Sequence, residues 1–124
     1  MAVIRSIRLW VQRTIRSQVW GMDIHPSTQI ELSALIDRTY PRGIHIGPDC
    51  WIGEEAVVLT HDRTRGFYLD TRIGARCCLG ERAIILPGLT VGDDCVVMPG
   101  AVVTRDMPPN SQALGNPAVI TPRC

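Results

Sequence analysis

Residues 72 to 106 read RIGARCCLGERAIILPGLTVGDDCVVMPGAVVTRD, and an aliphatic residue returns at every sixth position of this stretch. The aliphatic positions are Ile73, Leu79, Ile85, Val91, Val97 and Val103. An α-helix repeats every 3.6 residues and an amphipathic strand every 2, so a strict period of six fits neither of them as a single element. The period is typical of short strands separated by corners, which is the parallel β-helix class of repeat.

A second column of small residues follows the aliphatic column at a fixed distance of four positions. Its members are Thr28, Ala34, Cys50, Ala56, Cys77, Ala83, Cys95 and Ala101. We interpret this column as the inside of tight corners, where only small side chains fit. Glycine directly follows several of the aliphatic residues, as in Gly74, Gly80 and Gly92. We expect these glycines where the corner needs backbone freedom.

The cysteines fit the same register, which favours packing over chemistry. Three of the five cysteines occupy the small-residue column, and no CxxC pair occurs. We therefore predict corner fillers, with no zinc site and no other metal. An odd number of thiols without a signal peptide indicates the cytoplasm.

Length and charge restrict the function classes. A chain of 124 residues is expected to form one domain. Its net charge of +1 argues against a nucleic-acid partner. All thirteen basic residues are Arg, so each Arg carries less functional weight than usual.

The repeat divides the chain into three parts. Residues 1–21 place Ile4, Ile7, Val11 and Ile15 at helical spacing, with Val3 and Trp10 beside them and four Arg towards the opposite side. This amphipathic helix either caps the open end of the coil or rests on an anionic membrane surface, and the two roles are compatible. Residues 22–105 form the coil, with a loop at 61–72. Residues 106–124 form a Pro-rich C-terminal tail, which we expect to fold back along the coil without adding rungs.

The loop is the expected site of function, because rungs supply only scaffold. The register slips first at DRTYPRG, residues 37–43, and again at LTHDRTRGFYLDT, residues 59–71. His61 lies where the second break begins, and a neutral imidazole there could take a proton from an attacking hydroxyl. No GxSxG motif supplies a nucleophile. Asp62, Arg63 and Arg65 are candidates for substrate binding, while solvated roles stay open for all three.

The other two histidines have simpler interpretations. His25 precedes a proline at the start of the coil and is expected to be a turn residue. His45 directly precedes an aliphatic position and is expected to point outward.

With these features the sequence resembles the bacterial hexapeptide-repeat acyltransferases, over roughly residues 22 to 120. The motifs that carry the resemblance are the repeats, THD at 60–62, ILPGLTVGDDCVVMPGAVVTRDMPPNS at 85–111 and GNPA at 115–118. The resemblance implies an all-β fold, a single-stranded left-handed parallel β-helix, here with a short N-terminal α-helix. It also implies a homotrimer with an active site between neighbouring coils.

The resemblance further implies an acyl-CoA donor, usually acetyl-CoA, with His61 as general base. Gly80 and Glu81 occupy the stretch whose backbone amides hold the thioester oxygen in such enzymes. Pro99, Gly100, Thr104 and Arg105 match the segment that lines the pantetheine arm and touches the nucleotide end, where Arg105 could bind phosphate. Val119 follows GNPA where the family has a basic residue, so Arg123 would have to replace that contact.

These features predict an acetyl-CoA-dependent O-acetyltransferase acting on a hydroxyl-bearing small molecule or glycan precursor, in the cytoplasm or at the inner face of the membrane. An N-acetyltransferase of an amino sugar or a serine-like amine shares every residue named. A non-catalytic trimeric scaffold is the alternative from another class. The γ-carbonic anhydrases share the repeat, but the three histidines lack the paired spacing of their zinc ligands.

Overall fold

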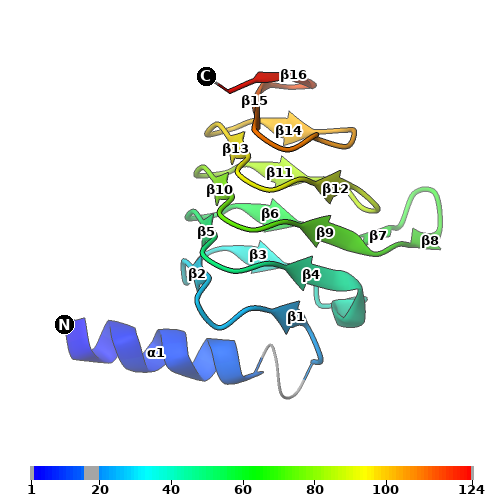
Figure 1. Cartoon of the computed structure of the whole chain (residues 1–124). Coiled ribbons are helices and arrows are strands. Elements are labelled where there is room, and N and C mark those ends of the chain that lie inside the picture. The colour runs from blue at the N-terminus through cyan, green and yellow to red at the C-terminus, as the bar shows by residue number, and fades with distance from the viewer. Residues whose placement is uncertain (1, 16–19, 124) are drawn as a thin grey trace.

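The chain forms a three-sided coil of short strands that run parallel from rung to rung (Figure 1). A computed structural model describes residues 2–15 and 20–123. Each full rung supplies one strand to each of three sheets, and the strands pair with those of the rungs above and below. The pairing of Ile36 with Val58, and of Val58 with Ile85, shows how residues of one column stack.

The strands are distributed over three sheets, which we name A, B and C. In spatial order, sheet A holds β1 (Asp23–Ile24), β4 (Ile44–Ile46), β9 (Thr71–Ile73) and β12 (Thr90–Val91). Sheet B holds β2 (Gln29–Ile30), β5 (Trp51–Ile52), β10 (Cys78–Leu79), β13 (Val96–Val97), β15 (Ser111–Gly115) and β16 (Ala118–Pro122). Sheet C holds β3 (Leu35–Ile36), β6 (Val57–Val58), β11 (Ile84–Ile85) and β14 (Val102–Val103).

Three corners join the sheets, and two of them position the candidate site. The BC corner, between sheets B and C, comprises residues 31–34, 53–56, 80–83 and 98–101. The CA corner, between sheets C and A, comprises residues 37–43, 59–70, 86–89 and 104–106. Segments of one corner therefore stack at roughly 4.8 Å per rung, the spacing of paired strands.

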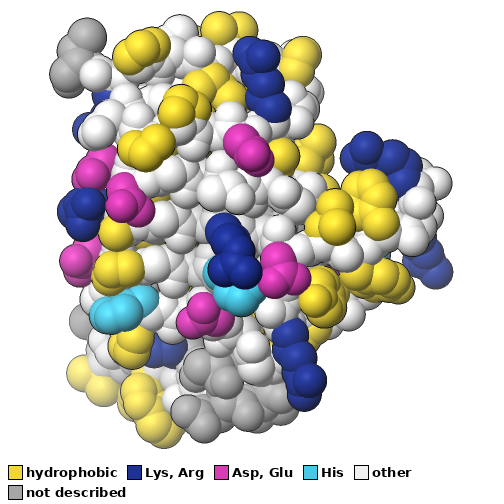
Figure 2. Space-filling view, turned by 45° about the vertical axis from the view of Figure 1, so that its right-hand side comes forward, with side chains coloured by type: hydrophobic (Ala, Val, Ile, Leu, Met, Phe, Trp, Pro, Cys, Tyr) yellow, Lys and Arg dark blue, Asp and Glu magenta, His cyan; other side chains and the backbone are white. Residues whose placement is uncertain are grey.

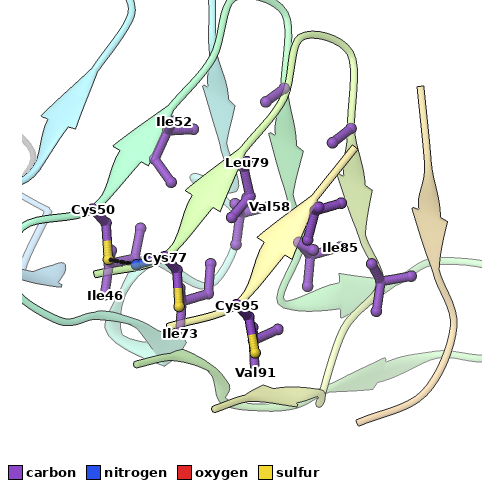
Figure 3. Close-up of a cluster of buried hydrophobic side chains, with 14 of the residues drawn as sticks. Ile46, Cys50, Ile52, Val58, Ile73, Cys77, Leu79, Ile85, Val91 and Cys95 are labelled. Atoms are coloured by element: carbon purple, nitrogen blue, oxygen red, sulfur yellow. Dashed lines mark hydrogen bonds between the residues drawn. The ribbon is translucent and has the colours of Figure 1, made fainter. Parts of the chain in front are cut away.

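The interior consists of the two columns that the sequence predicts. The aliphatic column is buried from Ile30 to Val103, and every member of the small-residue column is buried. Figure 3 shows Cys50, Cys77 and Cys95 stacked on successive rungs beside the aliphatic side chains. Their thiols donate to the backbone carbonyls of Gly74, Gly92 and Pro108 at 3.0 to 3.1 Å. The interpretation of these cysteines as corner fillers is confirmed.

The role expected for the repeat glycines is wrong, and the reason is steric. Gly47 lies outside the left-handed region, and a Cβ added to it would lie 2.9 Å from the backbone carbonyl of Gly74 on the next rung. The corner does contain a left-handed residue, but it is Asp49, with φ 58°. Glu55, Arg76, Arg82 and Asp94 occupy the equivalent positions of other corners. The repeat glycines thus allow rungs to approach one another, and non-glycine residues make the turn.

Two boundaries differ from the sequence prediction. Thr71 and Arg72 belong to β9 and not to the loop, because they pair with Ile44 and His45 of the rung below. The coil also continues beyond Arg105: Met107 bridges to Val91, and β15 adds a parallel strand to β13. Only β16 folds back, as the antiparallel partner of β15. The prolines of this segment lie at corners and at the strand end, so they do not prevent the extra rung.

The helix α1 (Ala2–Thr14) lies across the N-terminal end of the coil (Figure 1). The predicted helix continued to residue 20, but residues 16–19 lie outside the described residues. Arg5 bonds Glu31, while the apolar side chains of Val3, Ile7 and Trp10 are exposed. The helix contacts this end of the coil through Arg5, and its apolar stripe is turned outward. Among the described residues, no helix has the length and apolar content needed to cross a membrane.

Candidate active site

His61 and Asp37 form a hydrogen-bonded pair at the CA corner. His61 opens the hairpin of β7 (His61–Asp62) and β8 (Phe67–Tyr68), and Asp37 follows β3 on the rung below. The Nδ1 atom of His61 lies 2.7 Å from Oδ2 of Asp37. The imidazole keeps 26% of its surface exposed, whereas the carboxylate keeps only 4%.

The carboxylate of Asp37 is held by four donors. Besides the imidazole, Oδ2 accepts the amides of Thr60 and His61 at 3.0 and 3.2 Å, and Oδ1 accepts the amide of Thr39 at 2.8 Å. Burial alone would raise the pKa of Asp37, but the hydrogen bonds from Thr60, His61 and Thr39 outweigh it and lower this pKa. Asp37 is therefore ionised at neutral pH.

The ionised carboxylate fixes the tautomer of His61. A carboxylate can only accept hydrogen bonds, so Nδ1 of His61 must carry the proton. In the neutral ring the lone pair then lies on Nε2, which has no hydrogen-bond partner among the described residues. This arrangement suits a general base: one nitrogen is oriented by a buried acid and the other is free to accept a proton.

A cavity of about 380 Å³ adjoins the imidazole and is lined by Thr39, His61, Asp62, Arg63, Gly66 and Tyr68. The ring of Tyr68 stacks on His61 with centroids 6.1 Å apart and planes at 20°. Tyr40 packs against Tyr68 edge to face, also at 6.1 Å. The hairpin that carries this wall projects from the coil and bears hydrophobic and basic side chains (Figure 2). The cavity thus combines an aromatic wall with a base at its edge.

The three predicted substrate-binding residues have different surroundings. Asp62 accepts the Thr64 hydroxyl and the Arg65 guanidinium, and these bonds hold its pKa well below the usual range. Arg65 also lies over the ring of Phe67, at 4.8 Å from the centroid. Asp62 and Arg65 therefore shape the loop. Arg63 lines the cavity and has no ion-pair partner within the described part of the chain.

The predicted cofactor residues lie on two different corners. Gly80, Glu81, Pro99 and Gly100 stack on the BC corner, while Thr104 and Arg105 lie on the CA corner, two rungs beyond His61. The amide of Gly80 donates to the carbonyl of Val97 at 2.8 Å, so it is not available to a thioester oxygen. Of the pair Gly80 and Glu81, only Glu81 has a backbone amide that could bind a thioester oxygen. Within one chain, the BC corner and His61 are separated by the width of sheet C.

Asp37 was missed by the sequence analysis, although a signal was present. It is the first residue of the DRTYPRG insertion and directly follows Ile36. Pairing Ile36 with Val58 places Asp37 beneath the segment that leads to His61. Aligning the rungs on their aliphatic residues, and then comparing the next residues of each rung, would have brought this acid to His61.

The other histidines have structural partners. Nδ1 of His25 bonds the Ser27 hydroxyl at 2.8 Å, which confirms its assignment to a turn. His45 points outward from sheet A, as expected, with Asp23 and Asp70 each 3.0 Å from one ring nitrogen. Among residues 2–15 and 20–123, no group of three His, Cys, Asp or Glu side chains is placed to hold a metal ion.

Comparison with known proteins identifies the group to which this site belongs. A family model described as the hexapeptide repeat of succinyl-transferase matches residues 70–105. A Staphylococcus aureus protein named Putative acetyltransferase is 37% identical over 112 residues, which cover 89% of this chain and 70% of that protein. The chain belongs to the hexapeptide-repeat acetyltransferase family. The resemblance found in the sequence, and the enzyme class that it implied, are confirmed.

Other hexapeptide-repeat acetyltransferases show how far the likeness extends. Serine acetyltransferase 4 of Arabidopsis thaliana is 33% identical over 107 residues, which cover 82% of this chain but only 30% of that protein. The crystal structure of a maltose O-acetyltransferase from Clostridium difficile superposes with a TM-score of 0.62 at 28% identity, covering 90% of this chain and 74% of the other.

Proposed function

We propose that this chain is an acetyl-CoA-dependent O-acetyltransferase that modifies a hydroxyl group of a sugar or glycan precursor. The observation that carries the proposal is the 2.7 Å contact between His61 and the buried carboxylate of Asp37, beside a cavity with an aromatic wall. The likeness to a maltose O-acetyltransferase supports a sugar hydroxyl as acceptor. The sugar would lie on Tyr68, with Arg63 at the open side.

The proposed reaction is a direct transfer between two bound substrates. Nε2 of His61 takes the proton of the acceptor hydroxyl while the oxygen bonds to the acyl carbon of the thioester. The carbon–sulfur bond then breaks, and the leaving thiolate receives the proton from the imidazolium. Asp37 stabilises that imidazolium without itself being protonated, because its carboxylate faces Nδ1 throughout.

The donor would lie along the edge of the coil. Thr104 and Arg105 stack above His61 on the CA corner, where Arg105 is exposed and able to bind a phosphate. Glu81, Pro99 and Gly100 of the BC corner would line the pantetheine arm, with the Glu81 amide directed at the thioester oxygen. Because the two corners are separated within one chain, the second set would come from a neighbouring copy.

This arrangement requires the homotrimer of a left-handed β-helix. Sheet C, which lies between the two corners, turns an apolar row outward, with Leu35 exposed and Val57, Ile84 and Val102 half-buried. An apolar sheet face of this kind is stabilised when another copy covers it. Each copy would then supply His61 to a groove completed by the BC corner of its neighbour.

The test is the consumption of acyl-CoA by the purified chain with a panel of sugars, amino sugars and serine. Acetyl-CoA and succinyl-CoA should be compared as donors. His61→Ala should lower kcat by about two or more orders of magnitude, as for loss of a general base. His25→Ala is the matched control and should retain activity, because the His25 side chain bonds Ser27 of its own turn. Equal turnover by His61→Ala would end the assignment, and transfer to amines alone would replace O-transfer by N-transfer.

A further inference from the structure

The side of α1 that faces away from the coil is an apolar stripe. Its residues, which we call the outer stripe, are Val3, Ile4, Ile7, Trp10 and Val11, and they are 40% to 71% exposed. Positions 3, 7 and 11 follow one another at i, i+4 spacing, so they lie on one side of the helix. Five large apolar side chains in one continuous row form an exposed patch of the kind that marks an interaction surface.

The opposite side of α1 accounts for its attachment to the coil. Arg5, Leu9 and Arg13 line a cavity of about 240 Å³ against the first rung, together with residues of β1 and β2. Arg5 is paired there with Glu31. The helix is thus held by its polar side, and the outer stripe points away from the N-terminal end of the coil. Copies that pack side by side through sheet C would leave it uncovered.

Charge is distributed unevenly between this end and the rest of the chain. Four of the thirteen Arg precede residue 21, and none of the twelve acidic residues does. The first twenty residues therefore carry a formal charge of +4, and the remaining 104 carry −3. Arg8 borders the outer stripe and has no ion-pair partner among the described residues. If the outer stripes of two copies packed against each other end to end, the two basic N-terminal ends would be brought together. Their like charges would oppose this pairing.

We infer that the outer stripe docks the protein on an anionic lipid bilayer. An amphipathic helix with Trp and aliphatic residues on one side and Arg at its border lies in the interfacial plane, with the apolar side towards the acyl chains. Trp10 suits the interface because its ring is amphipathic. Arg8 supplies the attraction to lipid phosphates, while the negative body of the coil is kept away from the surface. In a trimer, three such helices would meet the bilayer at the same end.

The inference is tested by cosedimentation of the full chain with vesicles of phosphatidylcholine, alone or mixed with phosphatidylglycerol. The wild-type chain should bind the anionic vesicles and lose that binding at high salt. Arg8→Glu should weaken binding about thirtyfold, because it changes two charges near the surface. The double variant Ile7→Ser with Trp10→Ser should weaken it at least about tenfold, through loss of apolar contact with the acyl chains.

Two matched controls separate the outer stripe from general surface effects. Val119→Ser changes an equally exposed apolar residue, 62% exposed, in β16 at the far end of the coil. Arg82→Glu makes the same charge change as Arg8→Glu at the BC corner. Both should bind within about twofold of the wild type. Since all the altered side chains are exposed, circular dichroism should show the wild-type fold in each variant.

Three outcomes would overturn the inference. Equal binding to neutral and anionic vesicles would show that charge plays no role. Absence of binding to both would show that the outer stripe does not dock on a bilayer. Light scattering supplies the third: a particle mass that falls by half in the Ile7→Ser, Trp10→Ser variant would show that a second copy covers the stripe. Trp10 fluorescence, taken as the difference from Trp10→Phe, should shift to shorter wavelength only with anionic vesicles if the inference holds.

Discussion

The carboxylate of Asp37 lies one rung below the imidazole of His61, and the oxygen that holds Nδ1 also accepts the backbone amides of Thr60 and His61. The orientation of the ring is therefore coupled to the backbone at the point where the loop leaves the coil. Asp37 is a positioning residue in this arrangement, since it reaches the reacting atoms only through His61.

Replacing Asp37 with Asn should lower kcat about 10- to 1,000-fold with little change in KM, because an amide no longer enforces the tautomer with Nε2 unprotonated. The shape of the pH–rate profile should also change, which a purely structural role of Asp37 would not cause. Asp106→Asn is the matched control, since Asp106 accepts a backbone amide, from Thr90, without contacting a histidine. A double variant with His61→Ala should be no slower than His61→Ala alone.

The stability of the fold should decrease in acid, in part because of Asp37. Its pKa is lower in the folded chain than the ordinary 3.8, so the folded state binds this proton less readily than the unfolded state. The stabilisation is present above the unfolded pKa and is lost as pH falls through the folded pKa. Urea unfolding of wild type and Asp37→Asn from neutral to acidic pH should show a shallower loss in the variant. Parallel curves would show that other carboxylates, such as Asp70 and Asp94, dominate.

The sequence predicted the interior far better than the site. The sixfold register identified most of the buried side chains, because each rung repeats the same local packing. Asp37 and His61 lie just after the paired strands β3 and β6, at the starts of the two insertions, where the sixfold pattern ends. The pair becomes visible only when the two rungs are aligned on Ile36 and Val58. The cofactor residues were taken from the resemblance, and the structure separates them onto two corners of one chain.

Two features have a sequence pattern that leaves their structural role open. The apolar pattern of α1 says which side is apolar, but it does not say whether that side is covered, and in the structure it is not. The repeat glycines likewise have a pattern that suits either a turn or a close approach. Which of the two roles a glycine has depends on how closely the neighbouring rung approaches it, and the sequence of a single rung does not give that distance.

The link between His45 and Asp70 should control how firmly the loop is held. Nε2 of His45 lies 3.0 Å from Oδ2 of Asp70 at the end of the loop, and Tyr40 donates to the other oxygen at 3.1 Å. Such a group of His, acidic and basic side chains lies at the centre of the face in Figure 2. His45→Ala should release the end of the loop, and trypsin should then cleave after Arg63 and Arg65 severalfold faster. His25→Ala should leave the cleavage rate unchanged, and an equal acceleration in both would indicate general destabilisation.

Gly47 and Asp49 offer a matched test of the steric role of the repeat glycines, because they lie two residues apart in one corner. Gly47→Ala places a methyl group 2.9 Å from the backbone of Gly74, which should cost about 1 to 3 kcal/mol of unfolding free energy. Asp49→Gly removes a left-handed non-glycine residue at φ 58°, so it should change stability by less than about 1 kcal/mol. If Gly47→Ala were neutral, the packing of rungs would not explain these glycines.

The stack of Cys50, Cys77 and Cys95 should be replaceable by alanine without loss of activity. The equivalent position of the BC corner is filled by Ala34, Ala56, Ala83 and Ala101, so we expect a methyl group to be accepted at this position of a corner. The triple variant should lose about 1 kcal/mol per site, from the missing sulfur contacts, and keep its assembly and turnover. In the native wild type, a thiol reagent should not reach these three side chains, which are 3% exposed or less, until urea unfolds the chain. Fast modification of all three in the folded state, or loss of turnover in the triple variant, would give these thiols a chemical role that packing does not explain.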